Sequence, residues 1–266
     1  MKVMVVGGAG SIGSELVERL YGSREVVAVD ISEEGLFNLK YAKGEIGDIK
    51  DYRRIDELIT KYNPSLIYNA AAYKHVPAIE GSPIEAVKTN IMGLNILCLI
   101  AYKHGKDLIN ISTDKAVNPK SIMGMTKRIG ERVVADYGFM SLRLCNVIGS
   151  SGSLYPIIKK QIEAGGPVTL THKDMERYFI SKKKAAELLI SINRILDKRP
   201  GVFAIDTASM APVKILDVIK KLIYPKKIEI KEIGIRPGEK LKEELWSESE
   251  FVRPTSVPGI VAVHEA

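Results

Sequence analysis

The fold is decided by residues 2–13, which read KVMVVGGAGSIG. The apolar run at the start of this stretch is typical of a buried parallel strand. Glycines at positions 7, 10 and 13 follow it and open a segment with helical periodicity. Gly7 permits a tight turn, Gly10 lets a ligand approach the backbone, and Gly13 lets the helix pack closely on the strand. We therefore predict a phosphate-binding loop between the first strand and the first helix.

A helix that begins in such a loop binds the pyrophosphate of a dinucleotide, because its free N–H groups and its dipole both favour an anion. We expect the backbone at Ser11 and Ile12 to supply those N–H groups. Asp30 ends the next apolar run, 17 residues after Gly13. A carboxylate at this place accepts hydrogen bonds from the adenosine ribose and repels a 2′-phosphate, which favours NAD as the cofactor.

The acidic residues of this half have simpler alternatives. Asp30 can cap a turn with Ser32, as aspartate often does. A nearby Arg24 or Lys40 leaves NADP open as the cofactor. Asp48 follows the third strand and can meet the adenine amino group, but it can equally be a turn residue.

Short apolar runs alternate with helical patterns along residues 1–149. Strands are expected at 2–7, 26–30, 66–69, 108–112 and 140–145, and helices at 11–21, 51–62, 83–103 and 121–137. This alternation predicts an α/β fold with a doubly wound parallel sheet, a Rossmann domain. Residues 150–266 are expected to form a small α/β substrate-binding portion, partly interleaved with the sheet. Its expected helices are 155–164, 182–196 and 213–223, and its expected strands follow residue 167 and occupy 202–206.

Composition excludes several classes of protein. The chain has 266 residues, 45% of them hydrophobic and 27% charged, which is typical of a globular protein. The net charge of +7 comes from scattered lysines without interleaved aromatic residues, so we expect no nucleic-acid partner. Cys98 and Cys145 lie in apolar runs, as free thiols do in a reducing cytoplasm. No signal peptide, membrane segment or metal-ligating cluster is apparent, and we expect a cytoplasmic protein.

A second set of polar residues follows the fifth strand. Thr113, Asp114 and Lys115 come at its end, and Lys127 lies on the next helix, where these groups can converge on one nicotinamide. In short-chain dehydrogenases a tyrosine four residues before that lysine acts as the base, and Met123 stands at that position here. Because a thioether cannot carry the proton, another group must replace the tyrosine or the redox activity has been lost.

Motifs spread over nearly the whole chain point to one family. They are GGAGSIGS at 7–14, AAAYKHVP at 70–77, STDK at 112–115, NVIGS at 146–150, GGPVT at 165–169, MERYF at 175–179 and RPGEK at 236–240. Together they resemble the nucleotide-sugar dehydratases of polysaccharide biosynthesis, the inverting UDP-N-acetylglucosamine 4,6-dehydratase group of the extended short-chain dehydrogenases. One branch of that family is similar in having Met where other members have Tyr.

The resemblance implies a reaction that regenerates its cofactor. The sugar would be oxidised at C4 by hydride transfer to the nicotinamide, would lose the C5 proton and then water from C6, and would receive the hydride at C6. Thr113 would hydrogen-bond the C4 oxygen, and Lys127 would hold the nicotinamide ribose. Asp114 and Lys115 would serve C5 and C6 as acid and base, since adjacent opposite charges tune each other's pKa values in a closed site. Further cofactor contacts would come from Ile49, Ala70, Ala71 and Ala72.

The resemblance also implies how a UDP-sugar substrate is held. Asn146, Arg177 and Arg236 would bind the uridine diphosphate, since the planar fork of arginine suits phosphate oxygens. Residues 151–156, flexible in composition, would fold over the bound nucleotide sugar. Further substrate contacts would come from Tyr73, Lys74 and Glu239.

Several alternatives stay open at the level of residues. Tyr73, His75 or Lys115 could accept the proton that tyrosine accepts elsewhere. Asp114 and Lys115 could form a solvated pair at a strand end. Arg177 and Arg236 could be ordinary surface residues.

Two other functions also stay open. A UDP-sugar 4-epimerase is the nearest enzymatic alternative, although the Thr-Asp-Lys triplet favours elimination. A catalytically silent, NAD(P)-sensing regulatory protein is an alternative of another class, which Met123 supports. The retained Lys115, Lys127, Arg177 and Arg236 speak against it, because a sensor needs no sugar site.

Self-association is expected from two of the helical segments. The helices at 83–103 and 121–137 carry more apolar surface than one face of a sheet requires. Large apolar surfaces of this kind are covered by a partner in most proteins. We expect a homodimer, or a higher homo-oligomer, built on a four-helix contact.

Overall fold

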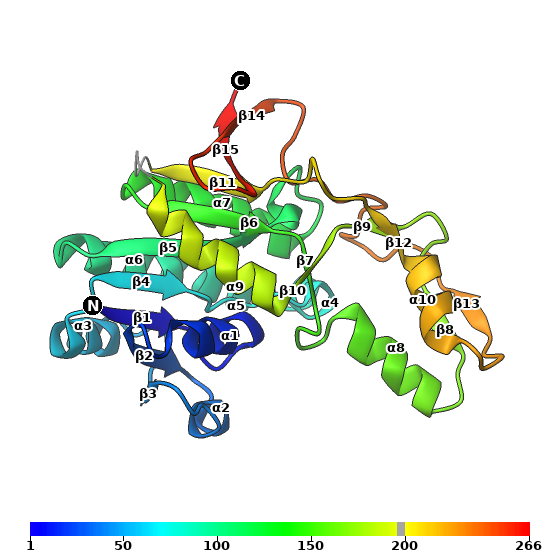
Figure 1. Ribbon diagram of the computed structural model, residues 1–266, viewed down its shortest axis with the longest axis horizontal. Helices are drawn as coiled ribbons and strands as arrows, with labels where there is room; N and C mark the ends of the chain where they lie inside the picture. Colours follow the sequence, from blue (N-terminus) through cyan, green and yellow to red (C-terminus); the bar gives the residue numbers. More distant parts are fainter. Residues whose placement is uncertain (196–199) are drawn as a thin grey trace.

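The computed structural model describes residues 1–195 and 200–266. Within them, nine strands form one sheet in the order β14-β15-β11-β6-β5-β4-β1-β2-β3 (Figure 1). Neighbouring strands are parallel, except where β15 pairs with β11 and with β14. The strands are β1 (Lys2–Val6), β2 (Glu25–Asp30), β3 (Lys43–Ile46), β4 (Leu66–Asn69), β5 (Asp107–Thr113), β6 (Met140–Leu144), β11 (Gly201–Ile205), β14 (Glu250–Pro254) and β15 (Ile260–Glu265).

Helices cover both faces of this sheet, because successive residues of a strand point to opposite sides. On β1, Val3 and Val5 pack in one core with α1 (Ser11–Leu20) and α9 (Lys182–Ser191). Met4 and Val6 pack in a second core with α3 (Tyr52–Tyr62) and α6 (Leu94–Lys103). A strand buried on both faces has to be apolar throughout, which is why the run at 3–6 is continuous. The predicted doubly wound fold is confirmed.

The ends of the helices follow from local residues. Asp51 accepts a hydrogen bond from the Arg54 N–H and caps α3, and Asn63, with a positive φ of 46°, ends it. Ser121 caps α7 (Ile122–Asp136) in the same way. The remaining helices are α2 (Glu33–Phe37), α4 (Val76–Glu80), α5 (Pro83–Ala86), α8 (Leu154–Glu163) and α10 (Ile215–Ile223), with the single-turn or irregular helices η1 (Val87–Gly93), η2 (Asp114–Ala116) and η3 (Ile192–Arg194).

The helix expected at 83–103 is a continuous run whose centre is irregular. α5 leads into η1, a π-helix, and η1 leads into α6. By length and composition this 21-residue run is apolar enough to cross a membrane, and half of its most apolar window is buried inside the protein. The sequence analysis, in which no membrane segment was apparent, did not recognise this run. Leu94, Leu97 and Cys98 from this run pack in the core that covers one face of the sheet.

The second half of the chain contributes to two regions. Its strands β11, β14 and β15 extend the main sheet, whereas α8 and α10 belong to a smaller lobe beside it (Figure 1). The lobe has its own apolar core, made by Ile158, Val168, Leu170, Met175, Ile215 and Ile219. Its strands pair two by two: β8 (Val168–Leu170) with β13 (Ile230–Glu232), and β9 (Glu176–Arg177) with β12 (Val213–Lys214). β7 (Asn146–Ile148) and β10 (Phe179–Ser181) pair where the sheet and the lobe meet.

The three expected helices of this half have different bounds in the structure, and the helix expected at 155–164 differs least, since α8 is Leu154–Glu163. The helix expected at 182–196 ends as α9 at Ser191 and continues as the short η3, and residue 196 lies outside the described residues. The helix expected at 213–223 begins only at Ile215, because Val213 and Lys214 pair with β9 instead. The strands at 250–254 and 260–265 were not predicted.

Candidate active site

A cavity of about 430 Å³ lies where residues after β4, β5 and β6 meet the smaller lobe. Doubly wound sheets bind their ligands beyond the carboxyl ends of the strands, so this is the expected place for a site. The predicted residues that line it are Ile12, Ala70, Ala72, Tyr73, Lys74, Thr113, Lys115, Met123, Lys127, Asn146, Arg177, Arg236 and Glu239. The predicted residues that do not line it are Gly7, Gly10, Ser11, Gly13, Asp30, Asp48, Ile49, Ala71 and Asp114.

The glycine loop is packed too closely for side chains. Gly7 has a φ of +80°, and a Cβ there would lie 2.4 Å from the backbone nitrogen of Ala71. A Cβ on Gly13 would lie 2.1 Å from the carbonyl oxygen of Gly7. α1 begins after Gly10, which provides no side-chain cap for the first turn. The loop therefore keeps the compact shape and the uncapped helix N-terminus that a pyrophosphate requires.

Both acidic candidates for cofactor binding make local turn contacts. Asp30 accepts hydrogen bonds from the N–H groups of Ala9 (2.9 Å) and Ser32 (3.0 Å), so the turn considered as an alternative is present. Asp48 accepts a hydrogen bond from the Lys50 N–H (2.9 Å). A carboxylate has about four acceptor positions, and these contacts leave some of them free for a ribose or a base.

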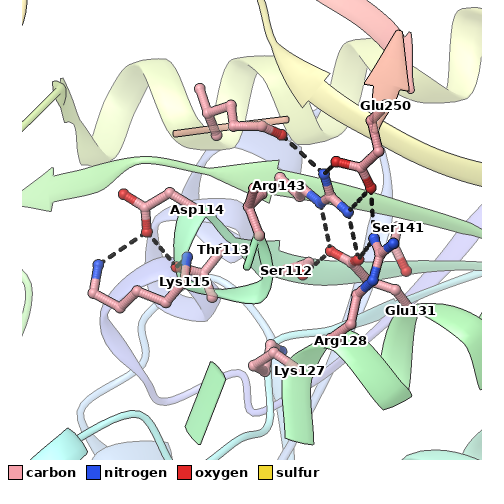
Figure 2. Close-up of polar contacts among 12 residues, drawn as sticks. Ser112, Thr113, Asp114, Lys115, Lys127, Arg128, Glu131, Ser141, Arg143 and Glu250 are labelled. Atoms are coloured by element: carbon pink, nitrogen blue, oxygen red, sulfur yellow. Dashed lines mark hydrogen bonds and ion pairs between the residues drawn. The ribbon is translucent and has the colours of Figure 1, made fainter. Parts of the chain in front are cut away.

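The triplet Thr113, Asp114 and Lys115 forms a compact polar cluster at the end of β5 (Figure 2). Asp114 is 2% exposed, and its Oδ1 accepts hydrogen bonds from Thr113 Oγ1 (2.8 Å) and Lys115 Nζ (2.9 Å). Its Oδ2 accepts a hydrogen bond from Asn146 Nδ2 (3.3 Å). The alternative of a solvated surface pair is therefore wrong: Asp114 lies behind the cavity wall, where it holds Thr113 and Lys115 in place.

Lys115 points into the cavity between two carboxylates. Burial lowers the pKa of Lys115, but the charges of Asp114 and Glu243 outweigh burial and raise this pKa above its ordinary value. Glu243 lies 3.9 Å from Lys115 Nζ and lines the cavity, and it was missed by the sequence analysis. It follows the RPGEK motif by three residues, and nothing in the sequence distinguishes it from its neighbour Glu244.

Met123 and Lys127 lie one turn apart on α7 and both line the cavity. Met123 is 3% exposed, so its thioether is part of the cavity wall. Lys127 Nζ donates a hydrogen bond to the carbonyl oxygen of Ile111 on β5. Burial lowers the pKa of Lys127 to about 8, although the charge of Glu131 acts in the opposite direction.

The segment after β4 brings three more predicted residues to the cavity. Asn90 fixes it, because its Oδ1 accepts a hydrogen bond from the Tyr73 N–H (2.8 Å) and its Nδ2 donates one to the Tyr73 carbonyl (3.0 Å). Burial and the charge of Lys182 lower the pKa of Lys74. Burial and the charge of Lys74 lower the pKa of His75 below its ordinary value of 6.5. Both effects favour the neutral form of the His75 imidazole.

The two arginines predicted to bind phosphate differ in what they can offer. Arg177 is 8% exposed, which excludes the surface alternative for it. Its Nη1 donates to the carbonyl oxygens of Glu176 (2.7 Å) and Leu241 (2.9 Å), and its Nη2 donates to that of Lys240 (2.8 Å). Much of the Arg177 guanidinium is therefore already hydrogen-bonded to backbone carbonyl oxygens. Arg236 is exposed at the rim of the cavity, where its guanidinium is open to a ligand.

A buried ionic network lies beside these residues (Figure 2). Arg143 is fully buried, and its guanidinium donates to Glu131 of α7 and Glu250 of β14, four times at 2.9 Å. Ser112 Oγ also donates to Glu131. Burial opposes the ionisation of Glu250, but the hydrogen bonds and charge of Arg143 lower its pKa to about 2. The network ties the helix that carries Lys127 to the last hairpin of the sheet.

Comparison with known proteins identifies one family. The profile of a family described as "Polysaccharide biosynthesis protein" matches residues 3–265. The chain is 39% identical over 283 residues to the probable polysaccharide biosynthesis protein EpsC of Bacillus subtilis, covering 97% of this chain and 47% of that one. It is also 39% identical over 286 residues to an uncharacterized membrane protein of Methanocaldococcus jannaschii, covering 98% of this chain and 85% of that one. The chain thus spans about half the length of the Bacillus relative.

Solved structures share the fold over nearly the whole chain. The structure of Pen from Bacillus thuringiensis has a TM-score of 0.88 at 28% identity and covers 100% of this chain and 86% of that one. The UDP-glucose 4-epimerase of Thermus thermophilus, solved in complex with NAD, has a TM-score of 0.81 at 22% identity and covers 92% of this chain and 90% of that one. At that lower identity the likeness shows the fold alone.

Proposed function

Because the chain belongs to the family of polysaccharide biosynthesis proteins, within the nucleotide-sugar dehydratases and epimerases, we propose that it is a nucleotide-sugar 4,6-dehydratase. Its substrate is UDP-N-acetylglucosamine or a close relative, and its product serves surface polysaccharide or glycan synthesis. The observation that carries this proposal is the Thr113-Asp114-Lys115 cluster, in which a buried carboxylate holds an ammonium group at the wall of the cavity. A 4-epimerase moves one hydride out and back and needs no such additional acid–base pair.

The residues of the glycine loop fit NAD. Gly7 and Gly13 leave no room for a Cβ, and the uncapped α1 can receive the pyrophosphate. Asp30 would hold the adenosine ribose and Lys127 the nicotinamide ribose. NAD, which the Thermus thermophilus epimerase binds, would supply the hydride acceptor at C4 and the hydride donor at C6.

The cluster can move protons at the sugar. Lys115 Nζ and Asp114 Oδ1 lie 2.9 Å apart, so a proton can pass between them. Through this exchange Lys115, which lines the cavity, takes the C5 proton and gives a proton to the C6 hydroxyl, which leaves as water, while Asp114 behind the wall serves as its proton partner. Thr113, whose hydroxyl lies 2.8 Å from the same Oδ1, is placed to turn toward the C4 oxygen.

His75 is the best-supported group to replace the missing tyrosine. It lines the same cavity as Thr113 and Met123, and its lowered pKa keeps it in the form that accepts a proton. Lys115 is held as an ammonium group by two carboxylates and is a poorer acceptor. Tyr73 is 42% exposed, with only its backbone fixed by Asn90.

The exposed apolar residues on neighbouring helices support a homodimer. Ile84 of α5 and Met92 of η1 are 64% and 56% exposed, and Met125 and Ile129 of α7 are 47% and 48% exposed. α7 packs against both α5 and η1, so these side chains lie on two adjacent helices. Two such helices from each copy would form the four-helix contact that we propose.

The experiment that tests the proposal follows the mass of the sugar nucleotide. The purified protein is incubated with UDP-N-acetylglucosamine and catalytic NAD or NADP, and the product is analysed by mass spectrometry and NMR. Loss of one water establishes the dehydratase. An unchanged mass with the NMR signals of the C4 epimer would establish the epimerase instead. Cofactor binding without any turnover of several UDP-sugars would support the sensing protein.

A further inference from the structure

Glu243 is a buried carboxylate that no part of the proposed reaction uses. Its side chain is 3% exposed, yet it lines the cavity together with Lys115 and Thr113. It comes from the segment that follows the RPGEK motif, far in sequence from the catalytic cluster. A buried charge is costly unless cations and hydrogen bonds compensate it, so its neighbours are informative.

Three cations surround the Glu243 carboxylate. Oε1 lies 3.9 Å from Lys115 Nζ and 3.7 Å from Arg177 Nη2. Oε2 lies 3.1 Å from Lys240 Nζ, which also donates a hydrogen bond to the carbonyl oxygen of Val117 (2.8 Å). Oε2 itself has no hydrogen-bond partner among the described residues. The carboxylate is therefore compensated mainly by the charges of these three cations.

The backbone that carries Glu243 is fixed before it by two contacts and after it by Arg143, which donates to the Leu245 carbonyl oxygen (2.9 Å). Arg177 donates to the carbonyl oxygens of Lys240 and Leu241. Lys240 donates to Val117, just beyond the helix that carries Asp114 and Lys115. These contacts fix the backbone from which the Glu243 side chain reaches the cavity wall.

We propose, on the premise of the dehydratase function, that Glu243 is a positioning residue. Its carboxylate holds the Lys115 ammonium at the cavity wall, opposite Asp114, and keeps Lys115 charged until the substrate is bound. Lys115 thus lies between the carboxylate of Asp114, on its own helix, and the carboxylate of Glu243, in the C-terminal segment. The C-terminal segment that contains the RPGEK motif thus contributes this carboxylate as well as Arg236.

The charged and titratable groups that face Lys115 make the proposal measurable. Asp114 and Glu243 raise the pKa of Lys115, and Arg177 lowers it. The nearby Cys145 thiol stays neutral, because burial raises its pKa to about 12. Removing the charge of Glu243 leaves one carboxylate against Arg177, so the pKa of Lys115 must fall.

The test uses Glu243→Gln, which keeps the shape, Glu243→Asp, which keeps the charge, and Glu244→Gln as the matched control on the exposed neighbour. Lysines are dimethylated with ¹³C-formaldehyde, and the Lys115 signal, assigned by its loss in Lys115→Arg, is titrated by NMR without substrate. We expect Glu243→Gln to lower the pKa of Lys115 by about one unit or more, Glu243→Asp by less, and Glu244→Gln not at all. An unchanged pKa in Glu243→Gln would overturn the proposal.

Kinetics give the second measurement. We expect Glu243→Gln to lower kcat roughly tenfold or more with KM changed less than about threefold, to move the basic limb of the kcat profile to lower pH, and to be partly rescued by Asp. A uniform loss at every pH that Asp does not rescue would mean a merely structural role and would refute positioning. The NMR titration needs no turnover, so a fallen Lys115 pKa in a protein without dehydratase activity would refute the proposed function while supporting the role of Glu243 toward Lys115.

Discussion

Lys127 shows how a single residue of the candidate site can lower the stability of this protein. Its ammonium group is buried on α7 with one hydrogen bond, to the Ile111 carbonyl, and burial lowers its pKa to about 8 from an ordinary 10.5. A lysine that binds protons less readily in the folded state destabilises that state below its folded pKa. The cost is fully present below about pH 8 and disappears as the pH rises toward 10.5.

We therefore expect Lys127→Met to stabilise the protein while abolishing turnover. A lowering from 10.5 to about 8 corresponds to about 3 kcal/mol, and the lost hydrogen bond offsets about 1 kcal/mol of it. Urea unfolding at pH 7 should show a gain of about 1–3 kcal/mol that shrinks as the pH approaches 10.5. Lys183→Met, on an exposed residue, serves as the control and should change stability by less than about 0.5 kcal/mol. A loss of stability with no dependence on pH would contradict this account of Lys127.

His75 leads to a prediction about the pH profile. A proton acceptor must be neutral, and the pKa of His75 lies below 6.5. The acid limb of kcat/KM should therefore lie below pH 6.5, with full activity at pH 7. His75→Gln should remove this limb and lower kcat about 100-fold without changing NAD affinity, as measured by calorimetry. Unimpaired turnover in His75→Gln, combined with a loss in Tyr73→Phe, would assign the proton to Tyr73 instead.

At the scale of residues, the sequence was informative where several motifs point to the same family. The residue types of Thr113, Asp114 and Lys115 alone left a solvated surface pair open, and it was the resemblance carried by the other motifs that favoured a catalytic cluster. Glu243 could not be predicted, because Glu244 beside it has the same chemistry and only burial separates the two. Arg177 was predicted as a phosphate ligand, but its use of the backbone carbonyls of the C-terminal segment depends on tertiary contacts alone.

At the scale of elements, the Arg143 network joins β6, α7 and β14 without access to water. A buried ion pair whose partner is removed leaves an uncompensated charge, which costs about 3–5 kcal/mol. Arg143→Met should lower the free energy of unfolding by that amount, measured by urea denaturation at pH 7. Arg132→Met is the matched control, because the Arg132–Glu265 pair is 70% and 66% exposed and should be worth less than about 1 kcal/mol. A loss below 1 kcal/mol in Arg143→Met would show that the network is not a main source of stability.

Whether a helix or strand could be predicted from the sequence depends on how far along the chain its packing partners lie. The longer strands and helices of residues 1–149 were predicted because each has its own periodicity and its own start and stop signals, whereas the five-residue helices α2 and α4 were not predicted. β14 was not, since its residues include Arg253 and Pro254 and alternate poorly, and its place is set by pairing with β15 and by Glu250. The π-helix η1 also escaped prediction, because an apolar pattern does not reveal an extra residue in a turn.

At the scale of the whole molecule, the dimer has a direct test. If α5, η1 and α7 form the contact, sedimentation should give twice the mass of one chain, and Ile129→Glu should shift the protein toward a monomer. Tyr224→Glu, at an 83% exposed position on the smaller lobe, should leave the mass unchanged. A monomer mass for the unaltered chain at every concentration would exclude this contact.

The overall architecture was predictable where each strand of the sheet is joined to the next strand in the sequence by a helix. Parallel strands with helical crossovers leave a strong pattern, and the glycine loop fixes where the first crossover begins. The cavity lies between the sheet and a lobe with a separate core, so its walls come from segments more than a hundred residues apart in sequence. Contacts between segments so far apart leave no local pattern in the sequence. The residues of the site were therefore predicted from motifs, but the cavity itself was not predicted.

The sheet order also constrains how this protein is made. Arg143 leaves the ribosome 107 residues before Glu250, the carboxylate that completes its compensation. At about 5–20 residues per second, that interval lasts roughly 5–20 s. During it residues 1–149 have their strands and their glycine loop, but one of the two carboxylates that hold the guanidinium has not yet been synthesised. The buried Arg143 network therefore cannot form completely until the β14–β15 hairpin has been synthesised. We expect nascent chains stalled before residue 250 to be sensitive to protease along their whole length.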